Sequence, residues 1–187
     1  MELVTEEHGV SSRGLLDEER HRRLVDERRA ARVRALLAPG SRTAHHFVGT
    51  ALRPSFFPID PSYRVPVRLE PAVAGAQTRR DRVNGETEDF PIVGLLRGSV
   101  DGQPFALEAA RMPDGTIQVD FRDASSGDES YGFRYLSVDP GEGPASGLDF
   151  NLARNPLCAY GDGYRCVLPP AQNTLAFAVR AGERRFP

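Results

Sequence analysis

The sequence predicts a mainly β protein, an antiparallel β-barrel or β-sandwich meander with one N-terminal α-helix. Three observations support this class. Several short segments alternate apolar and polar residues, turn dipeptides containing glycine separate those segments, and helical spacing of apolar residues occurs near the N-terminus. At 187 residues the chain is long enough for one domain with its own core. We therefore expect a charged helical extension over residues 1–40 and a single β-rich domain over residues 41–187.

A charged helix is predicted over residues 15–38, where apolar residues recur at helical spacing. They form a thin stripe that consists of Leu16, Leu24, Val25, Val33, Leu36 and Leu37. Acidic residues precede arginines by four positions, as in Glu19 and Arg23, which favours a solvated face whose charges pair with each other. So narrow a stripe could also join two subunits, and a homodimer through this helix is a further expectation. Pro39-Gly40 ends the helix.

The strands are predicted from alternation and from turns. The clearest alternation covers residues 63–69, where Pro66 favours the edge of a sheet. Asn-Gly or Asp-Gly turns separate the next three expected strands, which cover residues 92–100, 105–111 and 116–121.

Two further strands are expected over residues 131–138 and 175–179. Between the first strand and the second, residues 72–89 hold three arginines and four acids. We expect this charged segment to be an exposed, mobile loop.

The charge of the chain limits its partners. The net charge is −2, and all 24 basic residues are arginine. Such a small net charge gives no strong attraction to nucleic acid or to an anionic membrane. No apolar run approaches the roughly 18 residues that a membrane-spanning helix needs. We expect a soluble, cytoplasmic protein that binds neither nucleic acid nor membranes.

The two cysteines, Cys158 and Cys166, lie in a segment rich in Asn, Asp, Tyr, Pro and Gly that runs from Asp149 to Asn173. Four alternatives remain open for them: free thiols, a disulfide across the short loop, a metal site, or a catalytic thiol. Zinc normally takes four ligands at closer spacing, and His45 and His46 are the only further candidates within the folded region. We expect no metal and no cofactor.

Polar residues gather in two segments that could bind a ligand. The first follows the strand that ends at residue 121 and contains Arg122, Asp123, Ser126, Tyr131 and Arg134. Its arginines could hold a carboxylate or phosphate. Alternatively, its Asp and Ser side chains cap a turn while the arginines pair with acids.

The second segment contains Asp149, Asn151, Asn155, Tyr160 and Asn173. These side chains could line a polar ligand site. Equally, a long loop uses Asn and Asp to satisfy its own backbone where no strand ladder is available.

Several of these motifs resemble those of one family. They are Phe121-Arg122-Asp123 with Ser126-Gly127, Arg134-Tyr135-Leu136, and most of the segment from Asp149 to Asn173. From about Phe57 onward, over roughly two thirds of the chain, the sequence is similar to a bacterial and archaeal family known only as a domain of unknown function. Leu157 and Val167 stand where that family's pattern has prolines. The resemblance implies a shared fold and surface but supplies no mechanism.

We expect a binding or structural module. Its polar surface would join the Arg122–Arg134 region to the loop of residues 149–173 and would take a small anionic or polar ligand. One alternative is a hydrolase-type enzyme that uses Asp123, Asp149 or Cys158. Another is an interaction protein that acts through the helix. The sequence contains no nucleophilic serine between glycines, phosphate-binding glycine loop, zinc-protease helix or dinucleotide fingerprint.

Overall fold

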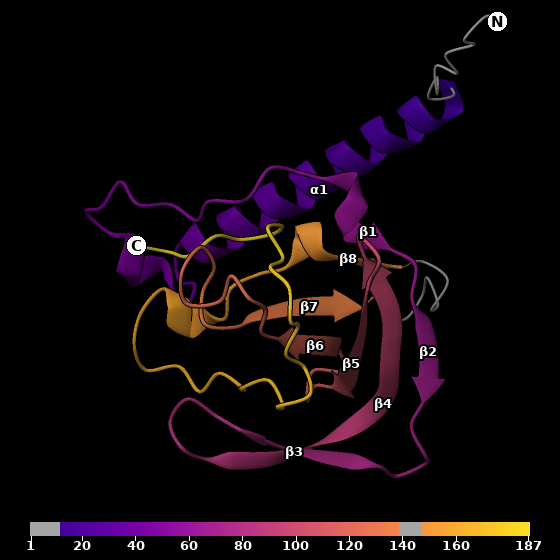
Figure 1. Ribbon diagram of the computed structural model, residues 1–187. Helices are drawn as coiled ribbons and strands as arrows, with labels where there is room; N and C mark the ends of the chain where they lie inside the picture. Colours follow the sequence, from indigo (N-terminus) through magenta and orange to yellow (C-terminus); the bar gives the residue numbers. More distant parts are fainter. Residues whose placement is uncertain (1–11, 139–146) are drawn as a thin grey trace, which may run out of the picture.

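The computed structural model describes residues 12–138 and 147–187. A long helix, α1 (Ser12–Leu37), crosses one end of a curved antiparallel sheet, and its N-terminal turns project beyond the sheet (Figure 1). This arrangement confirms the predicted mainly β class with one N-terminal α-helix. No helix in the described ranges is long and apolar enough to span a bilayer.

The main sheet has six strands, and its pairings are antiparallel. Its strands are β2 (Arg68–Pro71), β3 (Gln77–Asp81), β4 (Thr87–Val100), β5 (Gln103–Arg111), β6 (Ile117–Phe121) and β7 (Arg134–Val138). The order is β2-β4-β5-β6-β7, and β3 pairs with the first half of β4. Within the described residues β2 and β7 do not pair, so the sheet stays open and is not a barrel.

A small second sheet pairs β1 (Arg64–Val65) with β8 (Leu148–Asp149). The expected strand over residues 63–69 is therefore divided between β1 and β2. Pro66 lies in the gap, where its missing N–H cannot contribute to a ladder.

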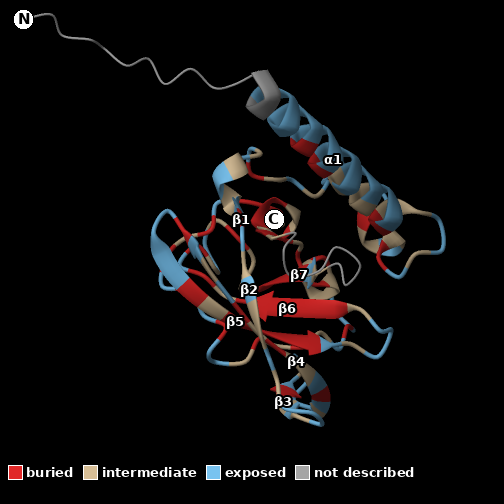
Figure 2. Cartoon of the chain, turned by 90° about the vertical axis from the view of Figure 1, so that its right-hand side faces the viewer, coloured by how far each residue is buried: buried red, intermediate tan, exposed pale blue. Residues whose placement is uncertain are grey.

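One face of the main sheet carries the apolar core. Leu107, Val119, Phe121 and Leu136 point to this face, and all are at most 1% exposed. Figure 2 shows β6 as a buried strand, whereas α1 is mostly exposed. Apolar residues from beyond β8 cover the core, and they include Phe150, Leu175, Phe177, Val179 and Ala181.

Two sequence predictions about segments are wrong. Residues 72–89 do not form an open loop, because β3 and β4 pair around the Asn84-Gly85 turn and Arg80 is buried. Residues 175–179 alternate between buried and exposed positions as expected but form no strand. Isolated backbone hydrogen bonds attach this segment instead, such as the one that the Ala124 N–H donates to the Phe177 carbonyl (3.1 Å).

Helix α1 docks on its own chain through polar as well as apolar contacts. Val25 and Leu36 are buried, and His21 Nε2 lies 2.7 Å from Asp149 Oδ2. Arg29 donates to the carbonyls of Asn151 and Phe57. The expected solvated, self-paired face is therefore only partly correct, since Glu19–Arg23 (3.8 Å) is the one ion pair within the described side chains of the helix.

The close approach of β2 to β4 at Gly94 allows a stability test. A Cβ on Gly94 would lie 2.8 Å from Leu69 Cδ1 and closer still to the carbonyl oxygen of Glu70, at a position where the β4–β5 register shifts. We expect Gly94→Ala to lower the free energy of unfolding by about 1–3 kcal/mol, because the crowded strands must move apart. Urea titration followed by circular dichroism measures this. Gly132→Ala, where a Cβ meets nothing within 4 Å, is the control, and equal stability of the two variants would contradict the expectation.

Candidate functional site

Arg134 and Asp123 form a fully buried ion pair. Their side chains are 0% exposed, and Arg134 Nη2 lies 2.7 Å from Asp123 Oδ2. Arg134 also donates to the carbonyls of Val179 and Ala181. Burial lowers the pKa of Arg134, while Asp123 raises it. The pair is thus occupied by the protein itself and attaches the C-terminal segment to β7.

The other members of the first predicted segment form separate hydrogen bonds and do not contact this ion pair as a group. Ser126 Oγ accepts from the Asp123 N–H (3.1 Å), as in a capped turn. Arg122 donates to the Pro169 carbonyl (3.3 Å). The Tyr131 hydroxyl points elsewhere, to the carbonyl and the sulfur of Cys158.

The asparagines of the second segment satisfy backbone groups. Asn151 exchanges two hydrogen bonds with the backbone of Asp60, of 3.0 and 2.8 Å. Asn173 accepts from the Glu108 N–H (2.7 Å) and donates to the carbonyls of Glu108 and Asp120. Asn155 donates to the Arg184 carbonyl (2.8 Å).

Asp149 and Tyr160 also have partners inside the protein. Asp149 accepts from the Asn151 N–H (3.0 Å) and pairs with His21. Tyr160 donates to the buried carboxylate of Glu183, which also accepts from the Asn155 N–H. The structure therefore places the predicted residues in several separate, largely buried groups. It brings together Arg134 with Asp123, Asp149 with Asn151, and Tyr131 with Cys158, and it places Asn155 and Tyr160 on the same carboxylate of Glu183.

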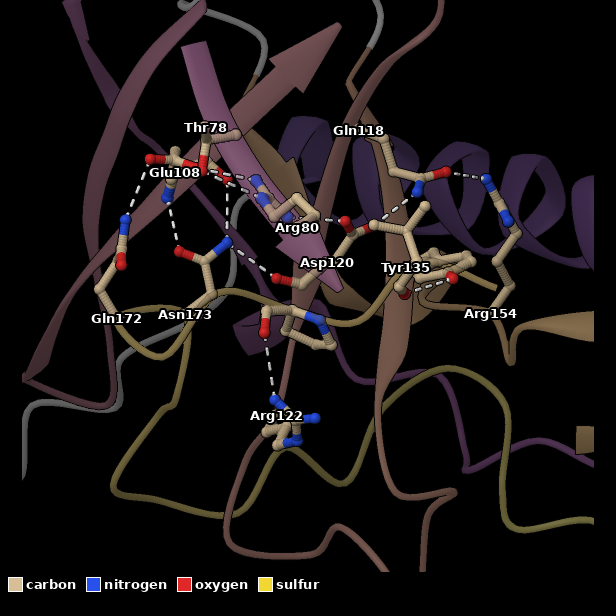
Figure 3. A network of polar contacts seen from close by, with 12 residues as sticks. Thr78, Arg80, Glu108, Gln118, Asp120, Arg122, Tyr135, Arg154, Gln172 and Asn173 are labelled. Carbon is tan, nitrogen blue, oxygen red and sulfur yellow. Dashed lines mark hydrogen bonds and ion pairs between the residues drawn. The ribbon is translucent and has the colours of Figure 1, made fainter. Parts of the chain in front are cut away.

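A buried polar network lies on the opposite face of the main sheet (Figure 3). Arg80 of β3 reaches between Glu108 of β5 and Asp120 of β6, at 2.8 and 2.9 Å. Gln118 donates to Asp120 and accepts from Arg154 Nη2 (2.9 Å). Burial raises the pKa of Asp120 to about 6, although Arg80 opposes the shift. The network ends at Arg154, at the rim of a groove.

This groove is the strongest candidate for a functional site. It has a volume of about 490 Å³ and is lined by four arginines. They are Arg42, Arg82, Arg154 and Arg165. Tyr135, Tyr164 and Cys166 also line it, and Glu88 is the one acidic residue among the described residues that line it. We call it the arginine groove.

The arginine groove has more positive than negative charge. Arg82 pairs with Glu88, and Arg165 pairs with Glu86. Among the described residues, neither Arg42 nor Arg154 forms an ion pair with a carboxylate. The guanidinium carbon of Arg154 lies 5.3 Å from the centre of the Tyr135 ring, and that of Arg42 lies 5.2 Å from Tyr164. Burial, and then the nearby Arg32, lower the pKa of Arg154.

No disulfide joins the two cysteines in the structure, and only Cys166 lines the arginine groove. The Cys158 N–H donates to Cys166 Sγ at 3.4 Å. A hydrogen bond from the Cys158 thiol, supported by the amides of Cys158 and Leu157, lowers the pKa of Cys166 to about 6. The same contact, together with burial, raises the pKa of Cys158. Cys158 faces a second hollow of about 480 Å³, which Tyr131 also lines.

The two histidines that were considered as further metal ligands, His45 and His46, belong to the 3₁₀-helix η1 (Ala44–Phe47). Across residues 12–138 and 147–187, no three His, Cys, Asp or Glu side chains gather as a metal site would require.

The fold and the arginine groove define a mainly β protein with an open antiparallel sheet and a cationic cleft beside two thiols. The chain belongs to the family described as protein of unknown function (DUF1684), whose model matches residues 52–184. It is similar to the solution structure of the uncharacterized protein from gene locus rrnAC0354 of Haloarcula marismortui, with a TM-score of 0.66 and 31% identity. That match covers 90% of this chain and 96% of the other. No curated protein matches.

The sequence did not single out the four arginines of the groove as site residues. Arg154 and Arg165 lie in the segment between Asp149 and Asn173, interleaved with tyrosines and cysteines, and this pattern was a usable signal. Arg82 lies in the segment that was expected to be an open loop. Arg42 follows the helix, and only the folded chain places it near Tyr164.

The buried ion pair provides a test of a structural role. We expect Asp123→Asn to lower the free energy of unfolding by about 3–5 kcal/mol, because it leaves the guanidinium of Arg134 buried without a counter-charge. Urea unfolding measures this against Asp128→Asn, which removes an exposed carboxylate. A loss below about 1 kcal/mol would show that Asp123 is not needed to hold Arg134.

The raised pKa of Asp120 predicts a pH dependence. The folded protein binds this proton more tightly than the unfolded chain, so the contribution of Asp120 is greatest below about pH 4 and is lost as pH rises through about 6. Relative to wild type, Asp120→Asn should therefore show a flatter decline of unfolding free energy between pH 4 and pH 6.5. Urea titrations at several pH values test this, with Asp128→Asn as the control. Parallel curves for wild type and Asp120→Asn would contradict it.

Proposed function

We propose that this protein binds a small ligand with carboxylate or phosphate groups in the arginine groove. The observation that carries the proposal is Arg154, a partly buried guanidinium without a carboxylate partner among the described residues. Taking a charge out of water is costly unless an opposite charge compensates it. A bound anion would supply that compensation.

The position of Arg154 suits such a role. Its Nη2 group is oriented by Gln118 (2.9 Å) and by Ser137 Oγ (3.3 Å), and the ring of Tyr135 supports its guanidinium. A guanidinium held in this way loses little further conformational freedom when it binds an anion. Planar, forked N–H donors also match carboxylate and phosphate oxygens well.

The second cation without a carboxylate partner completes the site. Arg42 packs over Tyr164, whose hydroxyl donates to the Arg42 carbonyl (2.7 Å), so backbone and side chain are both positioned. Tyr135 and Tyr164 add apolar surface, which favours a ligand with an organic body. The expected anionic ligand is thus retained, but its site is the arginine groove and not the Arg122–Arg134 region.

Thermal unfolding at low ionic strength with citrate or pyrophosphate tests the proposal. At about 100 times the dissociation constant, binding adds about 2.7 kcal/mol to stability, which raises Tm by roughly 5–10 °C for a domain of this size. We expect Arg154→Gln to weaken binding of either anion at least tenfold, through loss of a charge-assisted hydrogen bond.

Arg97→Gln is the matched control. It removes the same charge from a pair with Glu70 outside the arginine groove and should leave anion binding unchanged. The proposal fails if the anions stabilise wild type and Arg154→Gln equally, or if they stabilise neither.

A further inference from the structure

We propose that Cys166 and Cys158 form a reversible dithiol–disulfide couple that reduces an anionic, low-molecular-weight disulfide held in the arginine groove. This inference rests on the proposed function, because the arginine groove supplies the binding site for the substrate. It adds an activity and a substrate class, and it assigns a separate role to each thiol.

The two cysteines are in direct contact. Cys166 Sγ accepts from the backbone N–H of Cys158 at 3.4 Å. The sulfurs of a disulfide lie about 2.05 Å apart, so the couple requires the two side chains to turn toward each other. The intervening loop contains Gly161 and Gly163, the latter with a φ of +84°.

Backbone hydrogen bonds hold the chain around Cys166 on the sheet. The Cys166 carbonyl accepts from the Val83 N–H (3.0 Å), and the Leu168 N–H donates to the Asp81 carbonyl (2.7 Å). On the other side, the Tyr135 hydroxyl donates to the Val167 carbonyl (2.7 Å). These bonds hold Cys166 against the β3–β4 turn and β7, so the substrate meets a sulfur in a defined place.

Cys166 has the surroundings of an attacking thiolate. Its sulfur receives N–H and S–H donors, which stabilise negative charge, and it lines the groove that contains Arg42 and Arg154. The lowered pKa of Cys166 increases its thiolate fraction at neutral pH. The arginines would bring an anionic disulfide to it.

Cys158 has the surroundings of the second thiol. It keeps its proton while Cys166 is charged, because it donates to that sulfur. Once Cys166 is bonded to the substrate, this charge is gone and Cys158 can ionise. The Tyr131 hydroxyl, 3.7 Å from Cys158 Sγ, is then a donor to the new thiolate. Burial raises the pKa of Tyr131 to about 12, so it keeps its proton at neutral pH.

The two exchange steps balance. The Cys166 thiolate attacks one sulfur of the substrate disulfide, forms a mixed disulfide, and releases the other half as a thiolate that takes the sulfur–sulfur electron pair. Cys158 then loses its proton and attacks the Cys166 sulfur, and the second half leaves as a thiolate that takes up this proton. Two protein thiols become one disulfide, and one substrate disulfide becomes two thiols. An excess of a low-molecular-weight monothiol reverses both steps.

Reduced full-length protein and oxidised glutathione, an anionic disulfide, provide the experiment. By mass spectrometry, wild type should lose two hydrogens and gain no adduct, while Cys158→Ser should retain one glutathionyl group on Cys166. Cys166→Ser should react at least tenfold more slowly. An adduct that forms mainly on Cys158, or thiols that remain unreacted in wild type, would overturn the proposal.

A measurement on wild type alone guards against variants that fail to fold. The rate of alkylation of Cys166 by iodoacetamide, followed on its peptide, should rise through an apparent pKa near 6. An apparent pKa near 8.5, as for an ordinary thiol, would overturn the role of Cys166 as the attacking thiolate.

Comparison with a cationic disulfide separates the two proposals. Wild type should react faster with oxidised glutathione than with cystamine, and Arg154→Gln should lose this preference while Arg97→Gln keeps it. If the thiols react with both disulfides and Arg154→Gln changes neither rate, the dithiol–disulfide couple is supported, but the arginine groove is rejected as its substrate site. If citrate binds in the arginine groove but no disulfide reacts with Cys166, anion binding is supported and the dithiol–disulfide couple is overturned.

Discussion

The buried pair of Arg134 and Asp123 is the interaction on which the chain beyond β8 depends. The chain beyond β8 covers the apolar face of the sheet, yet it forms almost no strand ladder to pair its backbone. Arg134 supplies donors for its carbonyls, and Asp123 accepts from the Val179 N–H (3.2 Å). An ion pair costs desolvation energy when it is buried, and these additional hydrogen bonds offset that cost.

The need to pair the backbone of this irregular segment also explains why polar side chains are so dense after residue 149. A segment that packs its apolar side chains on a sheet also buries its amides, and each buried amide needs a partner. Within the segment, Glu183 accepts from the Asn155 N–H, and Asn155 donates to the Arg184 carbonyl. Asn151 and Asn173 instead bond the backbones of Asp60 and Glu108, so they attach the segment to the rest of the protein. The asparagines therefore satisfy buried backbone groups inside the segment and along its contact with the sheet.

The sequence predicted elements that are determined locally. The strands corresponding to β4, β5 and β6 follow from alternation and from turns that require glycine, such as Gly102 with a φ of +75°. It missed β3 because Arg80 resembles a surface residue until its partners on β5 and β6 are known. The expected strand over 175–179 had the correct alternation, but alternation reports which side chains are buried and not whether the backbone forms a ladder.

The candidate site was less predictable than the fold because its charges come from distant parts of the chain. Arg42 follows the helix, and Arg82 follows β3. Arg154 precedes the loop between Cys158 and Cys166, which we call the cysteine loop, and Arg165 lies within it. Whether an arginine is paired or available depends on which carboxylate lies beside it, and that is a property of the fold. The sequence does not distinguish Arg134 from Arg154 by charge state or pairing. In the fold, Arg134 pairs with Asp123, whereas Arg154 donates to the neutral oxygens of Gln118 and Ser137.

The location of the thiols beside those arginines follows from how the cysteine loop is attached. Irregular segments can carry reactive groups when a rigid scaffold fixes their ends. Here two hydrogen bonds attach the loop: the Val83 N–H donates to the Cys166 carbonyl, and the Tyr164 hydroxyl donates to the Arg42 carbonyl. The same bonds place Arg42 and Arg82 at the edge of the loop. The Cys166 sulfur and these guanidinium groups therefore line one groove because of how the loop packs on the sheet. Any activity of the thiols would therefore be coupled to charge in the groove, since Cys166 and Arg154 line the same cleft.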